Sequence, residues 1–232
     1  MKKSRKIIQS AHYQITHIII YKSIQKGEHC FMNMDEYQKV KDLTYLEYCD
    51  YLQRKYGIGL ANYMTKSYNI NSKCKRTKEG LIAHHKKEDT MIMLSNKEIA
   101  KIYPFEWQLK ENIVYCDYLE HLLLHVLICK YPANDEASFI HAGMGGVVDF
   151  LVPELNDLYS GWSTNQTWRK NCHDKVSSDK TVYLAILKQF VEIEKTNPVF
   201  KIDMLYRSYN QQYGLWDSKK NKPIYTEIKS LL

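Results

Sequence analysis

The sequence predicts an α+β protein, a mainly helical chain with a short two-stranded hairpin embedded near its middle. Three observations support this fold class. Apolar residues recur at helical spacing in several long segments, two short apolar runs have the length of strands, and capping-box motifs mark helix starts. With 232 residues, of which 44% are hydrophobic, the chain can bury a sizeable core as one domain or as two joined lobes.

The chain divides into three predicted regions. Residues 1–40 are polar and mixed, and we expect them to form a loosely attached N-terminal arm. Residues 41–131 carry a helix and then the embedded hairpin with its following helix. Residues 132–232 are expected to form a helical C-terminal lobe, with helices near residues 147–158 and 181–194, where apolar residues recur at helical spacing.

The first well-marked element of the middle region is a helix that begins after Thr44. Thr44 and Glu47 form a T-x-x-E capping box, apolar residues follow at helical spacing, and Gly57 supplies the left-handed exit. The stretch 66–78 is then basic and polar, which predicts an exposed connection that carries positive charge.

Two short strands are predicted next, at residues 80–85 and 112–116, with a long insertion at 86–111 between them. Inside the insertion, Ser95 and Glu98 form a second capping-box motif, so we expect a short helix that Ser95 starts.

A strongly apolar helix follows the second strand. Asp117 and Glu120 form a third capping box, and the helix is predicted from about Tyr118 to Lys130, where Pro132 ends it. The middle region therefore has the order strand, long loop, strand, helix.

Charge and composition narrow the function classes. The chain has 33 Lys and Arg against 26 Asp and Glu, a net charge of +7 that attracts polyanions. No apolar run approaches the roughly 20 residues of a membrane-spanning helix, so we expect no membrane partner and a cytoplasmic protein. The cysteines show no C-x-x-C pair, which argues against a disulfide scaffold or a zinc ribbon.

Four histidines fall inside the strand–loop–strand–helix unit. His84 and His85 are adjacent on the first strand, while His121 and His125 lie at i and i+4 on the helix, so that one helix face offers two imidazoles to one metal ion. Taken alone, such a helical pair is more often two partly buried histidines than a ligand pair.

The set His84-His85, Asn112, His121 and His125 resembles the motif of the H-N-H or ββα-metal nucleases. It is most similar to the colicin-type DNase branch, which has a His-His doublet, an Asn and two helical histidines at the same Asn-to-His and His-to-His spacings. The resemblance covers about residues 80–130 and implies a ββα-metal hairpin–helix core embedded in the chain.

The same resemblance implies a role for each of these residues. His84, His121 and His125 would bind one divalent metal ion, and the catalytic residues would be His85 and Asn112. His85 would be the general base that deprotonates the attacking water. Asn112 would pin the long loop and hold His85 in orientation. Imidazole has a pKa near neutrality, as a general base for phosphodiester hydrolysis needs.

Two features depart from the family pattern. The insertion after the doublet is longer than in the colicin DNases and lacks their Gly-rich loop. Most H-N-H enzymes have Asp where this chain has His84, and an all-imidazole ligand set suits Zn or Ni better than Mg. The metal is therefore left open among Zn, Ni, Mn and Mg.

Basic residues flank the doublet on both sides and are candidate phosphate contacts: Lys73, Lys75, Arg76, Lys78, Lys86 and Lys87. A merely solvated basic face is an equally common origin of such a run. DNA is the expected partner, RNA stays open because the charge attracts either polymer, and the C-terminal lobe is a candidate for dimerisation into a homodimer.

The sequence thus predicts a metal-dependent endonuclease that hydrolyses DNA phosphodiester bonds. Two alternatives remain: a metal-stabilised nucleic-acid-binding module without turnover, and an RNase with the same fold. His85 separates catalysis from a structural role, because a structural site has no use for an imidazole beyond its ligands.

Overall fold

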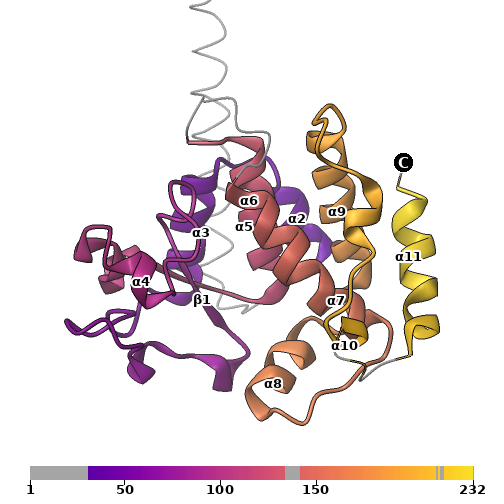
Figure 1. The fold of residues 1–232 in the computed structure, drawn as a ribbon. Helices are drawn as coiled ribbons and strands as arrows, with labels where there is room; N and C mark the ends of the chain where they lie inside the picture. The colour runs from indigo at the N-terminus through magenta and orange to yellow at the C-terminus, as the bar shows by residue number, and fades with distance from the viewer. Residues whose placement is uncertain (1–30, 134–141, 213, 215–216, 232) are drawn as a thin grey trace, which may run out of the picture.

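The structure is a computed structural model in which residues 31–133, 142–212, 214 and 217–231 are described. It is mostly helical, with one two-stranded antiparallel sheet among the described residues, which confirms the α+β class. Helices gather around a central helix on one side of the molecule, and the hairpin with its long loops lies on the other side (Figure 1).

The strands are β1 (Ile82–His85) and β2 (Ile113–Cys116). The described α-helices are α2 (Met34–Val40), α3 (Tyr45–Tyr56), α4 (Lys97–Ala100), α5 (Tyr118–Lys130), α6 (Ala142–Gly145), α7 (Val152–Tyr159), α8 (Thr167–Val176), α9 (Lys180–Glu194), α10 (Tyr209–Gln212) and α11 (Lys222–Lys229). A π-helix, η5 (Gly146–Leu151), joins α6 to α7. Short 3-10 turns complete the chain: η1 (Ser72–Cys74), η2 (Thr77–Glu79), η3 (Phe105–Gln108), η4 (Lys110–Asn112), η6 (Ile202–Leu205) and η7 (Ser218–Asn221).

The hairpin is shorter than the sequence predicted. β1 begins at Ile82 and pairs with β2 in the register Ile82↔Cys116 to His85↔Ile113. Asn112, predicted to start the second strand, instead ends the 3-10 turn η4. Its carbonyl oxygen still accepts a hydrogen bond from Lys86 N at 2.9 Å, so the ladder runs one step past the strand ends.

Two of the predicted capping boxes are present. The Thr44 side chain accepts a hydrogen bond from Glu47 N, and the Glu47 carboxylate accepts one from Thr44 N. Asp117 and Glu120 make the same reciprocal pair at the start of α5, whose bounds match the prediction. Both motifs satisfy N–H groups that a helix start leaves without intrahelical partners.

The predicted box at Ser95 and Glu98 is wrong. α4 begins at Lys97, and Asn96 caps it, because the Asn96 side chain accepts hydrogen bonds from Glu98 N and Ile99 N at 2.8 and 3.4 Å. Asn is at least as strong an N-cap as Ser, so the cap forms one residue later than the Ser95 motif indicated.

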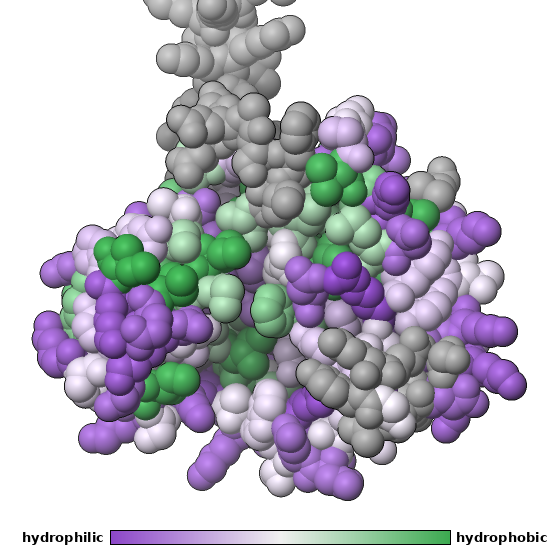
Figure 2. Space-filling view, in the orientation of Figure 1, coloured by the Kyte–Doolittle hydropathy of each residue, from purple (hydrophilic) through white to green (hydrophobic). Residues whose placement is uncertain are grey.

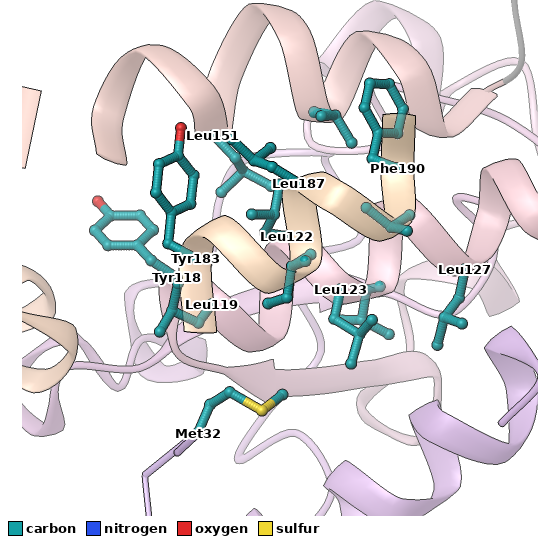
Figure 3. Packing of buried hydrophobic residues seen from close by; sticks show 14 of the residues in the cluster. Met32, Tyr118, Leu119, Leu122, Leu123, Leu127, Leu151, Tyr183, Leu187 and Phe190 are labelled. Atoms are coloured by element: carbon teal, nitrogen blue, oxygen red, sulfur yellow. The ribbon is translucent and has the colours of Figure 1, made fainter. Parts of the chain in front are cut away.

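The core is one hydrophobic cluster that runs from α2 and α3 through α5 to α9 and α11. Figure 3 shows Leu119, Leu122 and Leu123 of α5 close to Tyr183 and Leu187 of α9. Because nearly every side chain of α5 is buried, this helix is a rigid support for the two histidines that it carries.

Only part of the predicted N-terminal arm, residues 31–40, lies in the described structure. Residues 1–30 lie outside the described part of the chain. Met32, Tyr37 and Val40 are buried in the core cluster, and the Tyr37 hydroxyl donates to Gln189 Oε1 at 3.0 Å, so α2 packs on α9. The same cluster crosses the predicted boundary at residue 132.

The surface is largely hydrophilic, with apolar patches over the part of the chain around α4 (Figure 2). Ile92, Met93 and Ile102, in the long insertion, are among the exposed large hydrophobic residues. Within the described residues, every helix is too short or too polar to cross a bilayer.

Candidate metal centre

Four side chains from three parts of the chain converge at one point. His84 of β1, Glu88 in the turn after β1, and His121 and His125 of α5 each offer one ligand atom, and these atoms all lie within 4.8 Å of one another. Imidazole nitrogens and a carboxylate oxygen are donors for zinc and other transition metals. The cluster can therefore hold one divalent metal ion.

The periodicity of each element places its histidines. Neighbouring residues of a strand point to opposite faces, so the side chains of His84 and His85 contact different groups. On α5, the i and i+4 positions bring the rings of His121 and His125 to a centroid distance of 4.8 Å. The Asp117 cap fixes where α5 starts and hence which face these two residues occupy.

The donor spacings suit a tetrahedral ion. His84 Nδ1 lies 3.0 Å from His121 Nε2, which lies 3.1 Å from His125 Nε2. Glu88 Oε2 lies 3.4 Å from His84 Nδ1 and 3.7 Å from His125 Nε2. With Zn–N distances of about 2.0–2.1 Å, tetrahedral coordination requires ligand nitrogens roughly 3.3 Å apart, close to these four values, whereas the full set of donor atoms spans up to 4.8 Å and must contract around an ion.

Tyr45 fixes the tautomer of His84. The Tyr45 hydroxyl donates to the carbonyl oxygen of His85 at 3.1 Å and lies 2.8 Å from His84 Nε2. When the single hydroxyl proton is on the His85 carbonyl oxygen, the Tyr45 oxygen accepts a hydrogen bond from His84 Nε2–H. His84 is then unprotonated at Nδ1, the atom that faces the other donors. Such an outer partner is typical of metal-binding histidines.

Close packing of the segment after residue 141 confines His125. A Cβ at Gly146 would lie 2.2 Å from His125 Nδ1, and a Cβ at Gly143 would lie 2.2 Å from the carbonyl oxygen of His125. The Nδ1 atoms of His121 and His125 are buried and have no hydrogen-bond partner among the described residues. Both rings therefore direct their only engaged nitrogen, Nε2, into the cluster.

Burial keeps the three histidines in the form that binds metal. It lowers the pKa of His84 and His121 well below the ordinary value, and repulsion from neighbouring imidazoles lowers both pKa values further. Burial also lowers the pKa of His125, although the Glu88 carboxylate opposes this shift. Neutral imidazole is the ligand form, so these shifts favour metal binding over protonation.

Glu88 and His121 are the two more exposed members of the cluster. The side chains of His84 and His125 are 0% and 7% exposed, whereas that of Glu88 is 16% exposed. His121 is also partly exposed.

His85 lies beside the cluster and is not one of its donors. Its Nε2 lies 3.1 Å from Gln108 Oε1, and the Gln108 amide nitrogen donates to Leu94 O. The amide oxygen therefore accepts from Nε2–H of His85, which leaves Nδ1 with its lone pair. That Nδ1 lies 3.7 Å from Glu88 Oε1, so one carboxylate faces both the cluster and His85.

Asn112 acts within the long loop. Its side-chain amide donates to the carbonyl oxygen of Glu106 at 2.7 Å. The His85 side chain instead donates its hydrogen bond to Gln108, which lies in the same 3-10 turn as Glu106. Asn112 thus contacts the turn that carries the partner of His85.

Two of the predicted phosphate contacts are held by intramolecular bonds. The guanidinium group of Arg76 donates to both carboxylate oxygens of Glu79 and to the carbonyl oxygen of Tyr56. Lys86 Nζ lies 2.7 Å from Asp50 Oδ1. Both cations are therefore partly neutralised, and phosphate must compete with a carboxylate for each.

The other four predicted contacts have different surroundings. Lys73, Lys75 and Lys78 lie exposed around η1 and η2, and Lys87 is partly buried near the cluster. Within the described ranges, none of these four side chains makes an ion pair. They are the charges that remain available to a phosphate.

Sequence reasoning missed three residues of the site, namely Glu88, Tyr45 and Gln108. The signal for Glu88 is the run His-His-Lys-Lys-Glu, which sets a carboxylate four residues after His84. Glu88 N donates to His85 O at 3.0 Å, and this turn folds the carboxylate back over the doublet. Tyr45 and Gln108 lie far from the doublet in the sequence and carried no local signal.

No family model, curated protein or solved structure matches the chain. The arrangement defines a candidate metal centre with three imidazoles and one carboxylate.

Proposed function

We propose that this chain is a metal-dependent endonuclease of the H-N-H type that hydrolyses phosphodiester bonds in DNA. One observation carries the proposal: three imidazoles and a carboxylate from β1, the turn after it and α5 meet at one point, and a further imidazole, His85, lies beside them with Nδ1 facing Glu88. A site that only held a metal would not need this fifth group.

The chemistry follows from the two kinds of group. His84, His121 and His125, with Glu88, would hold the ion, which would stabilise the negative charge that develops on the phosphorane and on the leaving 3′ oxygen. His85 accepts a proton from the attacking water at Nδ1, while its Nε2–H remains bound to Gln108. Glu88 Oε1, 3.7 Å from Nδ1, stabilises the imidazolium that results.

A specific observation favours the competing function. With Glu88 as a fourth protein ligand the centre is closed, and closed four-ligand sites are typically structural. The chain would then be a metal-stabilised nucleic-acid-binding module. In the proposed enzyme, Glu88 is the ligand that water or phosphate replaces, which agrees with its greater exposure than that of His84 and His125.

The test is cleavage of supercoiled plasmid by the purified chain in EDTA and with Mg, Mn, Zn or Ni. We expect cleavage that depends on metal, and we expect His85→Ala to keep its metal while losing about 10²- to 10⁴-fold in rate. Glu88→Gln should keep metal through the three histidines and change the rate. Metal content and circular dichroism control for loss of the site or of the fold.

The outcomes separate the candidates. Stoichiometric metal without cleavage under any condition would leave the binding module as the function. Unchanged turnover of His85→Ala would move the base to another residue. Parallel reactions with RNA decide the substrate, and preferential RNA cleavage would replace DNase by RNase while leaving the site intact.

A further inference from the structure

A cavity of about 400 Å³ lies next to the hairpin, between β1, the η1–η2 segment and α8. This volume is within the range of ligand-binding pockets. Its walls are chemically mixed. Tyr63 and Trp168 contribute rings, Ile70, Leu81 and Ile82 contribute apolar surface, and Lys75 contributes a cation.

The cavity adjoins the proposed catalytic residue through Tyr63. The Tyr63 ring packs edge-on against the imidazole of His85, with centroids 4.4 Å apart, and Tyr63 also lines the cavity. The backbone of Tyr63 is fixed on both sides, because Tyr63 N donates to Gln108 O and Tyr63 O accepts from Asn71 N, each at 2.8 Å. One ring therefore separates the cavity from His85.

The wall that carries Trp168 is held firmly against the basic segment. Asn171 Nδ2 donates to Thr77 O at 3.2 Å, and Lys175 Nζ donates to Glu79 O at 2.9 Å. Gly80 permits this contact, since it has φ +72° and a Cβ there would lie 2.7 Å from Asn171 O. The position of α8, and with it of Trp168, is thus fixed relative to the basic segment.

Charge and exposure indicate what the cavity takes. Trp168 is 46% exposed, so its ring is open to a ligand. Arg76 lines the cavity but is committed to Glu79 and Tyr56, which leaves Lys75 as the available cation of the lining. Rings with apolar walls and one ammonium group match a flat heterocycle linked to a phosphate.

We propose that this cavity binds one unstacked nucleotide of a single strand, with its base against Trp168 and Tyr63 and its phosphate on Lys75. The inference rests on the proposed function, because it takes nucleic acid as the substrate. It adds that the preferred substrate has an unpaired nucleotide beside His85. A base inside a duplex is stacked on its neighbours and cannot enter. The chain therefore prefers single-stranded over duplex nucleic acid.

The test is binding of the full chain to a fluorescein-labelled single-stranded oligonucleotide, a matched duplex and adenosine monophosphate, in EDTA so that cleavage does not intervene. Trp168→Ala should weaken single-strand binding at least about fivefold, as expected for one lost base-stacking contact, and should leave duplex binding unchanged. The single strand should quench tryptophan fluorescence in the wild type and not in Trp168→Ala. Lys75→Ala should lower the salt slope for the single strand by about 0.7.

Matched variants control for general effects. Phe150→Ala removes an exposed ring of η5, and Lys188→Ala removes an exposed charge of α9; neither residue lines the cavity, so both should bind like the wild type. Equal single-strand affinity of Trp168→Ala and the wild type would overturn the proposal. Quenching by adenosine monophosphate but not by the strand would overturn the strand assignment.

Failure of the two proposals is distinguishable. If the chain cuts plasmid but Trp168→Ala binds the single strand like the wild type, the nucleotide site is wrong and the nuclease stands. If the single strand binds through Trp168 but nothing is cut, the nucleotide site stands on a protein without turnover.

Discussion

The hydroxyl of Tyr45 lies 2.8 Å from His84 Nε2 and donates to the backbone oxygen of the next residue, His85, at 3.1 Å. One side chain from α3 therefore orients the first ligand of the cluster and the strand end that carries the doublet. Tyr45 is buried, so bulk water does not reach the place of its hydroxyl in a Tyr45→Phe variant.

Tyr45→Phe should weaken metal binding about 10- to 100-fold, because His84 loses the acceptor that fixes its tautomer. Competition with a chromophoric chelator measures the affinity. Tyr48→Phe is the matched control, since Tyr48 lies on the same helix, is fully buried and has a hydroxyl without a partner in the described structure. Equal affinities of the two variants would contradict the role of Tyr45.

Gly146→Ala should lower metal affinity and destabilise the fold by about 1–3 kcal/mol, because the new Cβ would lie 2.2 Å from the His125 ring and displace it. Gly145→Ala should do neither, since the nearest atom to its Cβ would be 3.8 Å away and alanine favours a helix over glycine. Thermal melts and metal titrations of this neighbouring pair give the comparison. Loss of affinity in both variants would show that the effect is not local to His125.

The buried histidines of the metal-free protein should contribute a loss of stability as the pH falls below about 6.5. Burial lowers the pKa of His84 and His121 well below the ordinary 6.5, so below that pH the unfolded chain binds protons that the folded chain excludes. The contribution of these histidines to the free energy of unfolding is then largest above pH 6.5 and decreases below it. Melting in EDTA between pH 7.5 and 5.5 measures the slope, which His121→Gln should make shallower. Asp117, whose pKa burial raises to about 8, contributes in the opposite direction, so the comparison of slopes carries the test. Equal slopes for the wild type and His121→Gln would refute the buried neutral state.

The sequence predicted helix starts best where all the residues of the cap lie close together in the sequence. The boxes at Thr44 and Asp117 gave both helix starts, because each cap is complete within four residues of sequence. The start of α4 was misplaced because Asn96 competes with Ser95 for the same helix start. The π-helix η5 carries no such local signal.

The site was predicted to the extent that its residues share an element. His84 lies on a predicted strand, and His121 and His125 lie on one face of a predicted helix, so their periodicities could be read from the sequence. Glu88 reaches the cluster only through a turn, and Tyr45 only through the packing of α3 on β2. Contacts made by tertiary folding leave no spacing in the sequence.

Asn112→Ala should reduce stability by about 1 kcal/mol, because Glu106 O loses its hydrogen bond at a partly exposed position where water can replace it. The rate should fall through a shift of the turn that carries Gln108. Gln108→Ala should reduce the rate more, since Gln108 contacts His85 itself and is buried. Urea titration and plasmid cleavage measure the two effects. A larger loss of rate in Asn112→Ala than in Gln108→Ala would place Asn112 in direct contact with the reacting groups.

The salt dependence of nucleic-acid binding should depend on the exposed lysines and not on Arg76. Each lysine that contacts a duplex phosphate contributes about −0.9 to the slope of log K against log salt, so replacing Lys73 and Lys78 with Ala should flatten the slope by up to roughly two units. Arg76→Gln should change the slope little, because its guanidinium group is already bound to Glu79, and should instead lower the melting temperature through the lost contacts with Glu79 and Tyr56. Metal affinity should stay unchanged in both variants. A slope that is the same in the double lysine variant and the wild type would show that η1 and η2 carry a solvated basic face.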